Sequence, residues 1–348
     1  MIQLARKNIQ SLKPYSSARH EFEGKADIFL DANENPFNNG MNRYPDPFQE
    51  KVKERIEEIK GISPKNTFLG NGSDEAIDLL LRIYCEPGKD HIITLPPTYG
   101  MYQVSADINN VEVKKVNLTS DFQPDVPAIL KAANSHSKIL FICSPNNPTG
   151  NSIKRTTIKK LIQEFKGIVV IDEAYIDFAT DESATSFIGK YPNIVVLQTF
   201  SKAWAMAGIR LGMAFASEEI IGLFNKVKPP YNINSITQKA ALVGTRDLEA
   251  FNKSISTILE ERQKLAEALS EFSFVQKVYP SDANFILVKV EQPNELYDFL
   301  VRKKIVVRNR STVVLCEGCL RFTIGKPKEN DQLLKALRKW EKKKPVLN

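Results

Sequence analysis

The segment GIVVIDEAYIDF, residues 167–178, places four consecutive apolar residues, 168–171, directly before two carboxylates, Asp172 and Glu173. A short run without a polar position predicts a strand that is buried on both faces, as in a parallel sheet. A carboxylate at the end of such a strand is costly to bury unless it meets a cation or a metal ion. The alternative is a surface acid just beyond the strand end, and both interpretations stay open here.

Similar apolar runs alternate with helix-like segments from about residue 67 to residue 230. This alternation predicts an α/β fold whose large domain has a mostly parallel central sheet covered by helices. Helices then dominate to residue 272, and a second alternation predicts a smaller α+β C-terminal domain. Strands are expected at 92–95, 111–116, 139–143, 168–171, 194–198 and 212–216, and in the smaller domain at 284–290, 305–308, 313–315 and 320–324, with helices at 48–60 and 296–303.

We expect three parts along the chain. Residues 1–30 form an N-terminal arm that packs with the small domain, residues 31–245 form the large domain, and residues 246–348 form the small C-terminal domain. Within the large domain, DANENPFNNGMNRYPDP at 31–47 predicts a long loop by its Asn, Pro and Gly content.

Composition excludes several classes of protein. The chain has 348 residues and is 42% hydrophobic and 26% charged, which is typical of globular proteins. No apolar run approaches the ~18 residues of a membrane span, and the charged start MIQLARKNIQ does not resemble a secretory signal. Four cysteines are too few for a disulfide scaffold and fit a reducing compartment. We therefore predict a cytoplasmic protein without a membrane partner.

The net charge of +7 is concentrated in the tail, residues 326–348, which has eight basic and three acidic residues. A basic tail is one signature of nucleic-acid binding, but this one has no interleaved aromatic residues and no accompanying motif. We interpret it as a solvated C-terminal helix and predict no nucleic-acid partner. Its buried stripe is expected to comprise Leu333, Leu334, Leu337 and Trp340.

The pair Cys316-x-x-Cys319 is interpreted as incidental to a hairpin. A zinc site requires four ligands, whereas the chain has no second such pair and its three histidines are scattered. A redox pair precedes a helix, whereas this one joins two strand-like runs with Gly318 in the turn. We predict no metal.

Two segments carry weak signals of a ligand. In TFLGNGSDEAIDLLLRIYC, residues 67–85, Gly70 and Gly72 allow backbone amides to approach an anion at the start of a helix, although a plain turn capped by Ser73 or Asp74 explains them equally. In LPPTYGMY, residues 95–102, the ring of Tyr99 is placed to cover a planar ligand, although a packed loop tyrosine is commoner.

Two further loops follow predicted strands. SPNNPTG, residues 144–150, places Asn146 and Asn147 where ligands gather in open α/β sheets, although turn formation also explains them. TFSKAWAMAGIRLG, residues 199–212, sets Lys202 among small and apolar residues, near Ser201 and Arg210. Poor solvation lowers the pKa of a lysine and supplies the neutral amine that a Schiff base needs.

Together these features fit one ligand, pyridoxal 5′-phosphate. Its phosphate suits the Gly72 turn, Ser201 and Arg210, and its flat ring suits Tyr99. Its ring nitrogen needs an anion, Asp172, and its phenolic oxygen needs donors, Asn147 and Tyr175. Its aldehyde needs an amine, Lys202.

The order of these segments resembles the fold-type I pyridoxal-phosphate-dependent aminotransferases, and within them the histidinol-phosphate aminotransferases. The resemblance covers nearly the whole chain, in nine segments: KPYSSAR (13–19), ANENP (32–36), NRYPD (42–46), NGSDE (71–75), PPTYGMY (96–102), SPNNPTG (144–150), DEAYIDF (172–178), TFSKAWAMAGIRLG (199–212) and GCLRFTIG (318–325).

The resemblance implies a role for each matching residue. The catalytic residues would be Lys202, bound to the cofactor aldehyde, Asp172 at the pyridine nitrogen, and Tyr175, which with Asn147 would hold the 3′-oxygen. The other cofactor contacts would be Tyr99 on the ring, and Ser73, Asp74, Ser201 and Arg210 on the phosphate, with Tyr44 reaching the phosphate from the other subunit of a homodimer. The substrate side would comprise Arg321, Arg308, Tyr15 and Asn33.

The implied activity is reversible amino transfer between L-histidinol phosphate and 2-oxoglutarate, which gives imidazole acetol phosphate and L-glutamate, in L-histidine biosynthesis. An aromatic-amino-acid aminotransferase and a pyridoxal-phosphate-dependent decarboxylase of a phosphorylated amino acid are alternatives, because the same cofactor residues serve all three. A regulator with an aminotransferase-like domain is disfavoured, since it needs a DNA-binding module and we expect no room for one ahead of residue 67.

Overall fold

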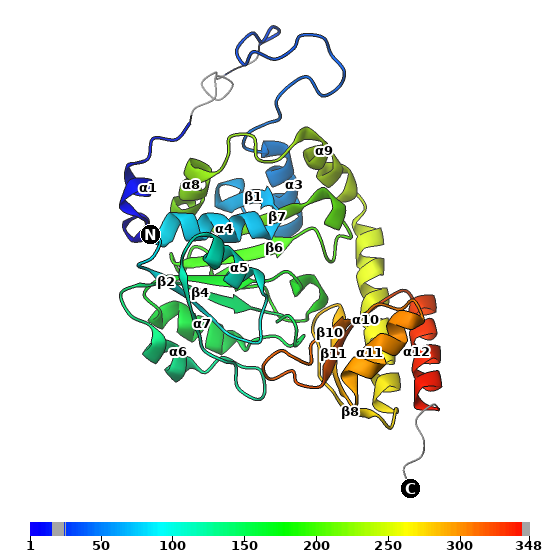
Figure 1. Cartoon of the computed structure of the whole chain (residues 1–348). Coiled ribbons are helices and arrows are strands. Elements are labelled where there is room, and N and C mark those ends of the chain that lie inside the picture. The colour runs from blue at the N-terminus through cyan, green and yellow to red at the C-terminus, as the bar shows by residue number, and fades with distance from the viewer. Residues whose placement is uncertain (16–23, 25, 343–348) are drawn as a thin grey trace.

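The computed structural model describes residues 1–15, 24 and 26–342, and two sheets organise it (Figure 1). The larger sheet has seven strands in the order β1-β7-β6-β5-β4-β2-β3. Pairing from β6 to β3 is parallel, whereas β7 is antiparallel to both β6 and β1, so the predicted mostly parallel sheet is confirmed. The strands are β1 (Thr67–Asn71), β2 (His91–Thr94), β3 (Glu112–Lys115), β4 (Ser137–Cys143), β5 (Ile168–Asp172), β6 (Ile194–Thr199) and β7 (Leu211–Ala216).

The central strands are apolar at successive positions because both faces of the sheet are covered. In β5, Val169 and Ile171 belong to one hydrophobic cluster, whereas Ile168 and Val170 belong to the other. Helices contribute to each cluster and close the two faces. On the first face they are α3 (Glu50–Lys60), α6 (Val126–Ala132), α7 (Arg155–Glu164) and α9 (Ser235–Gly244); on the second they are α4 (Ser73–Tyr84), α5 (Met101–Ile108) and α8 (Glu218–Val227).

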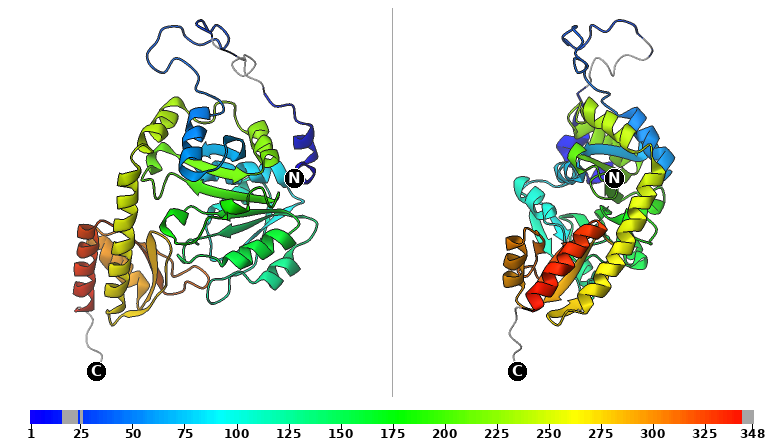
Figure 2. Two further views of the ribbon diagram at one scale, coloured as in Figure 1. Left: turned by 180° about the vertical axis from the view of Figure 1, so that it is seen from behind. Right: turned by 90° about the vertical axis from the view of Figure 1, so that its right-hand side faces the viewer.

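The smaller sheet is antiparallel, with the order β10-β11-β9-β8, and helices cover it (Figure 2). Its strands are β8 (Val275–Val278), β9 (Phe285–Val290), β10 (Arg308–Asn309) and β11 (Cys319–Thr323), and its helices are α10 (Leu248–Ser270), α11 (Pro293–Arg302) and α12 (Pro327–Glu341). In α12, Leu333 and Leu337 are buried and Leu334 and Trp340 are partly buried, which confirms the tail helix over its described residues. The domain boundary at 245/246 stays a proposal, just ahead of the long helix α10.

Two strand predictions near the C-terminus are wrong. Residues 313–315 form no strand, because the backbone from Arg310 to Cys319 makes successive turns, with Val313 N–H donating to Arg310 O and Cys316 N–H to Val313 O. Only Arg308 of the strand expected at 305–308 pairs with β11. Conversely, β8 was not predicted, because VQKV has only two apolar residues.

The first residues pack on the large sheet's helices, so the expected packing of the N-terminal arm with the small domain is wrong for this part of it. Arg6 N–H donates to Ile83 O of α4 at 2.8 Å, and the N-terminal ammonium lies 2.9 Å from Glu219 at the start of α8. The apolar residues Ala5 and Ile9 are buried in the same cluster as α4 and α8, which fixes α1 (Lys7–Ser11) there.

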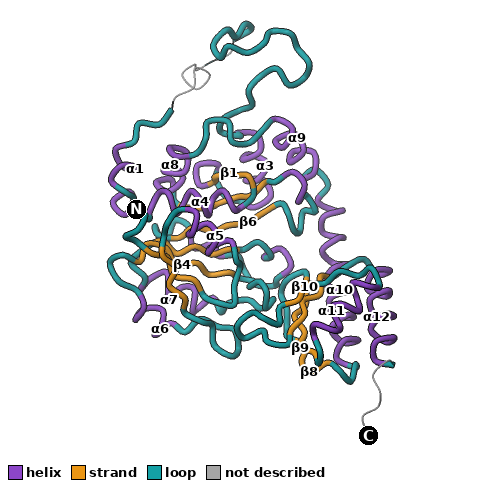
Figure 3. Tube along the Cα trace, viewed as in Figure 1, coloured by secondary structure: helices purple, strands orange, loops and turns teal. Residues whose placement is uncertain are grey.

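Residues 26–47 leave the body as an extended loop (Figure 3). Several large apolar side chains on it are exposed, among them Ile28 at 78%, Leu30 at 90% and Phe37 at 83%. Exposed apolar side chains gathered in this way are typical of interaction surfaces in proteins. Separately, a search of the described helices finds none with the length and apolarity to cross a membrane.

Candidate active site

A cavity of about 750 Å³ opens where β4, β5 and β6 end, and it is completed by the start of α4 and by β10 and β11. This is the edge at which open α/β sheets bind ligands. Eleven of the fourteen predicted site residues line it: Ser73, Asp74, Tyr99, Asn147, Asp172, Tyr175, Ser201, Lys202, Arg210, Arg308 and Arg321.

Asp172, the last residue of β5, is buried, with 2% of its surface exposed, so the surface-acid alternative is wrong. Burial raises the pKa of its carboxyl to about 6. Two hydrogen bonds act in the opposite direction: the Tyr102 hydroxyl donates to Oδ2 at 2.6 Å, and the Ala174 amide donates to Oδ1 at 3.2 Å. A buried carboxylate held this way, at the floor of a cavity, is suited to a cationic ligand group.

The neighbouring carboxylate, Glu173, has a different role. It is buried too, but its oxygens accept hydrogen bonds from the Ser183 hydroxyl (2.5 Å), the Ala184 amide (2.7 Å) and the Gln198 side chain (2.9 Å). Through these three hydrogen bonds Glu173 connects the loop that follows β5 with strand β6. Glu173 therefore stabilises the fold, and Asp172 is the acid that faces the cavity.

The start of α4 is open to an anion. Gly72 is the N-cap residue, with φ of 72°, and no side chain caps the helix, so neither Ser73 nor Asp74 acts as the N-cap. A Cβ at Gly72 would lie 2.8 Å from Arg210 Nη2, and a Cβ at Gly212 would lie 2.1 Å from the Ser73 amide nitrogen. The two glycines thus let Arg210 and the helix N-terminus approach each other, which makes an anion site.

At the opposite end of the cavity lie a phenol, an amide and a guanidinium. Asn147 Nδ2 donates to the Tyr175 hydroxyl at 3.5 Å, and Arg321 Nη1 donates to Asn147 Oδ1. The bond from Arg321 orients the amide so that its NH2 group faces Tyr175. Arg308 lies directly opposite Arg321 in the β10–β11 ladder, so two guanidinium groups meet at this wall.

Lys202 projects between these two ends and is exposed at the cavity. Its Nζ lies 5.7 Å from the centre of the Tyr175 ring. Partial burial, and next the positive charge of Arg321, lower the pKa of the ammonium group, while Asp172 opposes the shift. These effects shift the equilibrium toward the neutral amine, which is the direction that the sequence predicts.

Three predicted residues do not line this cavity. Tyr15 and Asn33 are exposed, and Asn33 belongs to the extended loop. Tyr44 is 52% exposed and stacks on Tyr231 of its own chain, with ring centroids 4.5 Å apart. All three precede α3. They could reach an active-site cavity only if this part of the chain were arranged differently, or if the cavity belonged to a second subunit.

Two lining or supporting residues were not predicted. Tyr102 supports Asp172 from α5, stacked on Phe141 with centroids 4.5 Å apart. Its signal was its position three residues after Tyr99, which places both rings on one side of a helix start. Arg310 lines the cavity beside Arg308 and Arg321. Its signal was the i, i+2 spacing from Arg308, which places two side chains on one strand face.

The residues present fit pyridoxal 5′-phosphate. Among the described residues Asp172 forms no ion pair with a basic side chain, so its buried charge is available for a pyridinium nitrogen. The uncapped start of α4 with Arg210 suits the phosphate, and the donors Asn147 and Tyr175 suit the phenolic oxygen. Lys202 is the amine placed between them.

Cys316 and Cys319 lie outside this chemistry. Both are buried and free, and burial raises the pKa of each thiol, to about 12 for Cys316 and about 11 for Cys319. Thiols held in the protonated form are poor nucleophiles. A search of the described residues finds no group of three or more side chains placed to hold a metal ion.

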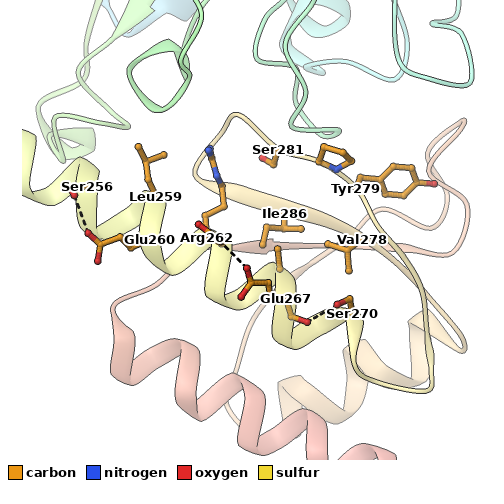
Figure 4. A pocket seen from close by; sticks show the side chains of 13 residues that line it. Ser256, Leu259, Glu260, Arg262, Glu267, Ser270, Val278, Tyr279, Ser281 and Ile286 are labelled. Atoms are coloured by element: carbon orange, nitrogen blue, oxygen red, sulfur yellow. Dashed lines mark hydrogen bonds between the residues drawn. The ribbon is translucent and has the colours of Figure 1, made fainter.

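A second cavity, of about 650 Å³, lies between α10 and the turn after β8 (Figure 4). Arg262 of α10 donates to the carbonyl oxygens of Ala283 (2.9 Å) and Phe178 (3.3 Å). Because Phe178 belongs to the loop after β5, this arginine links the two sheets. Because the Arg262 side chain donates to backbone carbonyl oxygens, we assign this cavity no ligand.

The chain is similar to known aminotransferases over most of its length. Residues 27–337 match the family model described as aminotransferase class I and II. A histidinol-phosphate aminotransferase from Parabacteroides distasonis is 56% identical over 335 residues, which is 96% of this chain and 97% of that protein. The crystal structure of the Clostridium acetobutylicum histidinol-phosphate aminotransferase is 28% identical, with a TM-score of 0.79 over 87% of this chain and 91% of that one.

A third likeness concerns the fold alone. The Sinorhizobium meliloti histidinol-phosphate aminotransferase, solved in complex with pyridoxal 5′-phosphate, is 22% identical, with a TM-score of 0.79 over 86% of this chain and 83% of that one.

Proposed function

The chain belongs to the family of class I and II aminotransferases, and we propose that it exchanges the amino group of L-histidinol phosphate with 2-oxoglutarate. The observation that carries the substrate is the pair of guanidinium groups, Arg308 and Arg321, at the wall of the cavity opposite the phosphate end. Arginine binds phosphate and carboxylate oxygens through paired donors, so one wall serves both the phosphate ester and the dicarboxylic acid.

The enzyme is a pyridoxal-5′-phosphate-dependent aminotransferase. When bound, the cofactor supplies an electron-accepting ring in conjugation with the α-carbon of the amino acid. Asp172 would hold the ring nitrogen in its protonated form, and Asn147 and Tyr175 would donate to the ring oxygen. Tyr99 would cover the ring, with its hydroxyl held by Asp74 Oδ1 at 3.1 Å. The amides of Ser73 and Asp74, with Ser201 and Arg210, would bind the phosphate.

Lys202 is the residue placed to move a proton at the substrate α-carbon. Its amine would hold the cofactor, and when it is not bound to the cofactor it would act as the base. The lowered pKa increases the fraction of the amine that is neutral at a given pH. Borohydride reduction followed by peptide mass mapping is expected to place the pyridoxyl group on Lys202, and labelling of another lysine instead would refute this assignment.

The substrate proposal is tested with a panel of amino donors. Purified enzyme is given L-histidinol phosphate, phenylalanine or O-phosphothreonine with 2-oxoglutarate, and glutamate and carbon dioxide are measured. We expect kcat/KM for histidinol phosphate to exceed that for phenylalanine by ~100-fold or more, because the single carboxylate of phenylalanine offers fewer oxygens and less charge to the arginine wall than a phosphate ester does. A preference for phenylalanine would support the aromatic aminotransferase, and carbon dioxide release would support the decarboxylase.

We also propose that the enzyme is a homodimer whose active sites are shared, and that it works in the cytoplasm. Support for the dimer comes from the extended loop, 26–47, where Ile28, Leu30 and Phe37 are exposed. A second copy related by two-fold symmetry would cover both loops equally. Tyr44 lies on this loop outside its own cavity, which suits a contact with the partner's phosphate site. The four free, buried cysteines suit a reducing compartment.

Mixed dimers test the shared site. Lys202→Ala abolishes chemistry in its own site, whereas Tyr44→Ala is expected to weaken turnover roughly 2- to 12-fold through loss of one hydrogen bond. A dimer with one chain of each kind has one fully intact site if Tyr44 acts across the interface. Its turnover is then expected to approach about half that of wild type, which equals or exceeds that of Tyr44→Ala. Turnover at only about half that of Tyr44→Ala would show that Tyr44 acts within its own chain.

A further inference from the structure

Three arginine side chains share one wall of the active-site cavity. Arg308 is directly opposite Arg321 in the β10–β11 ladder, and Arg310 follows two residues later, with its backbone N–H donating to Cys319 O at 2.9 Å. Alternate residues of an extended strand point to the same side. All three side chains therefore face the cavity, which each of them lines.

This arrangement has an energetic cost. Like charges placed opposite each other destabilise a ladder. Burial, followed by the charges of Arg321 and Arg308, lowers the pKa of Arg310. No ion pair among the described residues involves any of the three, and the Nε atoms of Arg310 and Arg321 are buried without a hydrogen-bond partner. Buried, unpaired donors are rare in proteins and indicate a missing acceptor.

The number of charges indicates which acceptor is missing. Arg321 already donates to Asn147, and together with Arg308 it can hold a carboxylate through paired donors. A carboxylate has one negative charge and two oxygens. A phosphate monoester has about two charges near pH 7 and three terminal oxygens, so it has an acceptor left for a third guanidinium.

We propose that Arg310 is a specificity-determining residue, which with Arg308 and Arg321 forms a three-guanidinium site for the phosphate dianion of the amino donor. The inference rests on the proposed function, because it assigns this wall to the substrate. Arg310 finds an acceptor when the phosphorylated donor binds, whereas it stays unpaired when glutamate occupies the same site. It therefore distinguishes the two amino donors that one active site must accept in turn.

The test compares two donors with the same form of the holoenzyme. Single-turnover reactions of the pyridoxal form with histidinol phosphate and with glutamate are followed by absorbance, for wild type, Arg310→Gln, Arg310→Lys and the control Arg302→Gln. Arg302 is exposed at the end of α11 and does not line the cavity. We expect Arg310→Gln to lower the second-order rate constant for histidinol phosphate about 10- to 150-fold, as loss of one charge-assisted hydrogen bond implies. The constant for glutamate should change less than about 3-fold, and Arg310→Lys should recover part of the loss.

The pH dependence provides a readout that a structural defect would not change. A phosphate ester has its second pKa near 6, so the wild-type preference for histidinol phosphate over glutamate should decline as pH falls from about 7.5 to 5.5. The preference of Arg310→Gln should change less over this range. Equal losses for both donors, or no loss for histidinol phosphate, would overturn the proposal.

Inorganic phosphate separates failure of this proposal from failure of the proposed function. It should inhibit the wild-type holoenzyme in competition with glutamate, and inhibit Arg310→Gln at least about 10-fold more weakly. If histidinol phosphate is not a substrate but this difference holds, the three-guanidinium site stands and another phosphorylated amine is its ligand. If inhibition is the same in both proteins, Arg310 does not bind phosphate, whatever the substrate is.

Discussion

Replacing Tyr102 with phenylalanine is expected to change the acidity of Asp172 without disturbing the packing around it. The hydroxyl donates to Asp172 Oδ2 at 2.6 Å, while the ring stacks on Phe141 and packs edge-on against Tyr99. Phenylalanine preserves both ring contacts and removes only the hydrogen bond. Tyr102 therefore acts as a positioning residue, through Asp172.

The size of the effect follows from the structure. A hydrogen bond to a charged group contributes about 1.5–3 kcal/mol, and one pKa unit corresponds to about 1.4 kcal/mol. Loss of the bond therefore moves the midpoint of the Asp172 titration upward by about one to two pH units in the cofactor-free protein. Burial already raises the pKa of this carboxyl to about 6. A large fraction of the variant is then neutral at pH 7, where the ring nitrogen needs an anion.

The assay is the affinity of the cofactor-free protein for pyridoxal 5′-phosphate between pH 6 and 9, measured by absorbance. Tyr102→Phe should bind the cofactor weakly near pH 7 and recover as pH rises, because its carboxyl ionises at higher pH than in wild type. Tyr84→Phe is the matched control, since Tyr84 is also buried but its hydroxyl has no hydrogen-bond partner. A Tyr102→Phe profile that superimposes on wild type would refute the reasoning.

Three further expectations concern the cofactor site. Asp172→Asn should retain some cofactor but lose most turnover, measured by absorbance and by the glutamate assay; near-normal turnover would exclude its role at the ring nitrogen. Gly212→Ala should weaken cofactor binding about tenfold or more, because the new Cβ would lie 2.1 Å from the Ser73 amide nitrogen. Gly222→Ala, whose new Cβ would lie in open space on α8, is the control and should leave binding unchanged when both variants are titrated with the cofactor. Arg321→Met should move the pH midpoint for acetylation of Lys202 upward in the cofactor-free protein, because it removes a cation that disfavours the ammonium form. Peptide mass mapping measures the acetylation, and an unchanged or lower midpoint would contradict this expectation.

The large sheet could be predicted from the sequence because its strands are buried on both faces. The predicted boundaries of its central strands lie within two residues of the observed ones: residues 168–171, for example, became Ile168–Asp172 in β5. Strands of the small sheet were harder to predict. β8 has the sequence VQKV and is only partly buried, so no continuous apolar run marks it. The apolar residues at 313–315 suggested a strand, but the turns around them prevent pairing.

The candidate site was predictable where function depends on a residue's place at a strand end. Asp172 and Lys202 follow apolar strands, and both line the cavity. Tyr102 and Arg310 were missed because their roles depend on distant partners: one hydroxyl meets a carboxylate 70 positions away, and one guanidinium joins Arg321 through strand register. The spacings from Tyr99 and Arg308 indicate a shared face, but they do not indicate these partners. Tyr15 and Asn33 lie outside the cavity, on the part of the chain ahead of α3.

The pairing of β1 with β7 has a consequence for the amount of enzyme in a cell. Gly72 N–H donates to Arg210 O at 2.8 Å, and Gly212 lies against Ser73, so the two halves of the phosphate site come from opposite ends of the large domain's sequence. In an unfolded chain these halves are far apart, so we expect neither to bind a phosphate by itself. A cofactor that binds only the folded chain would stabilise it by about 2.7 kcal/mol at a free concentration of 100 times Kd. When the cofactor is scarce, a larger share of newly made chains stays open to proteases, so cofactor supply would control the abundance of the enzyme as well as its activity.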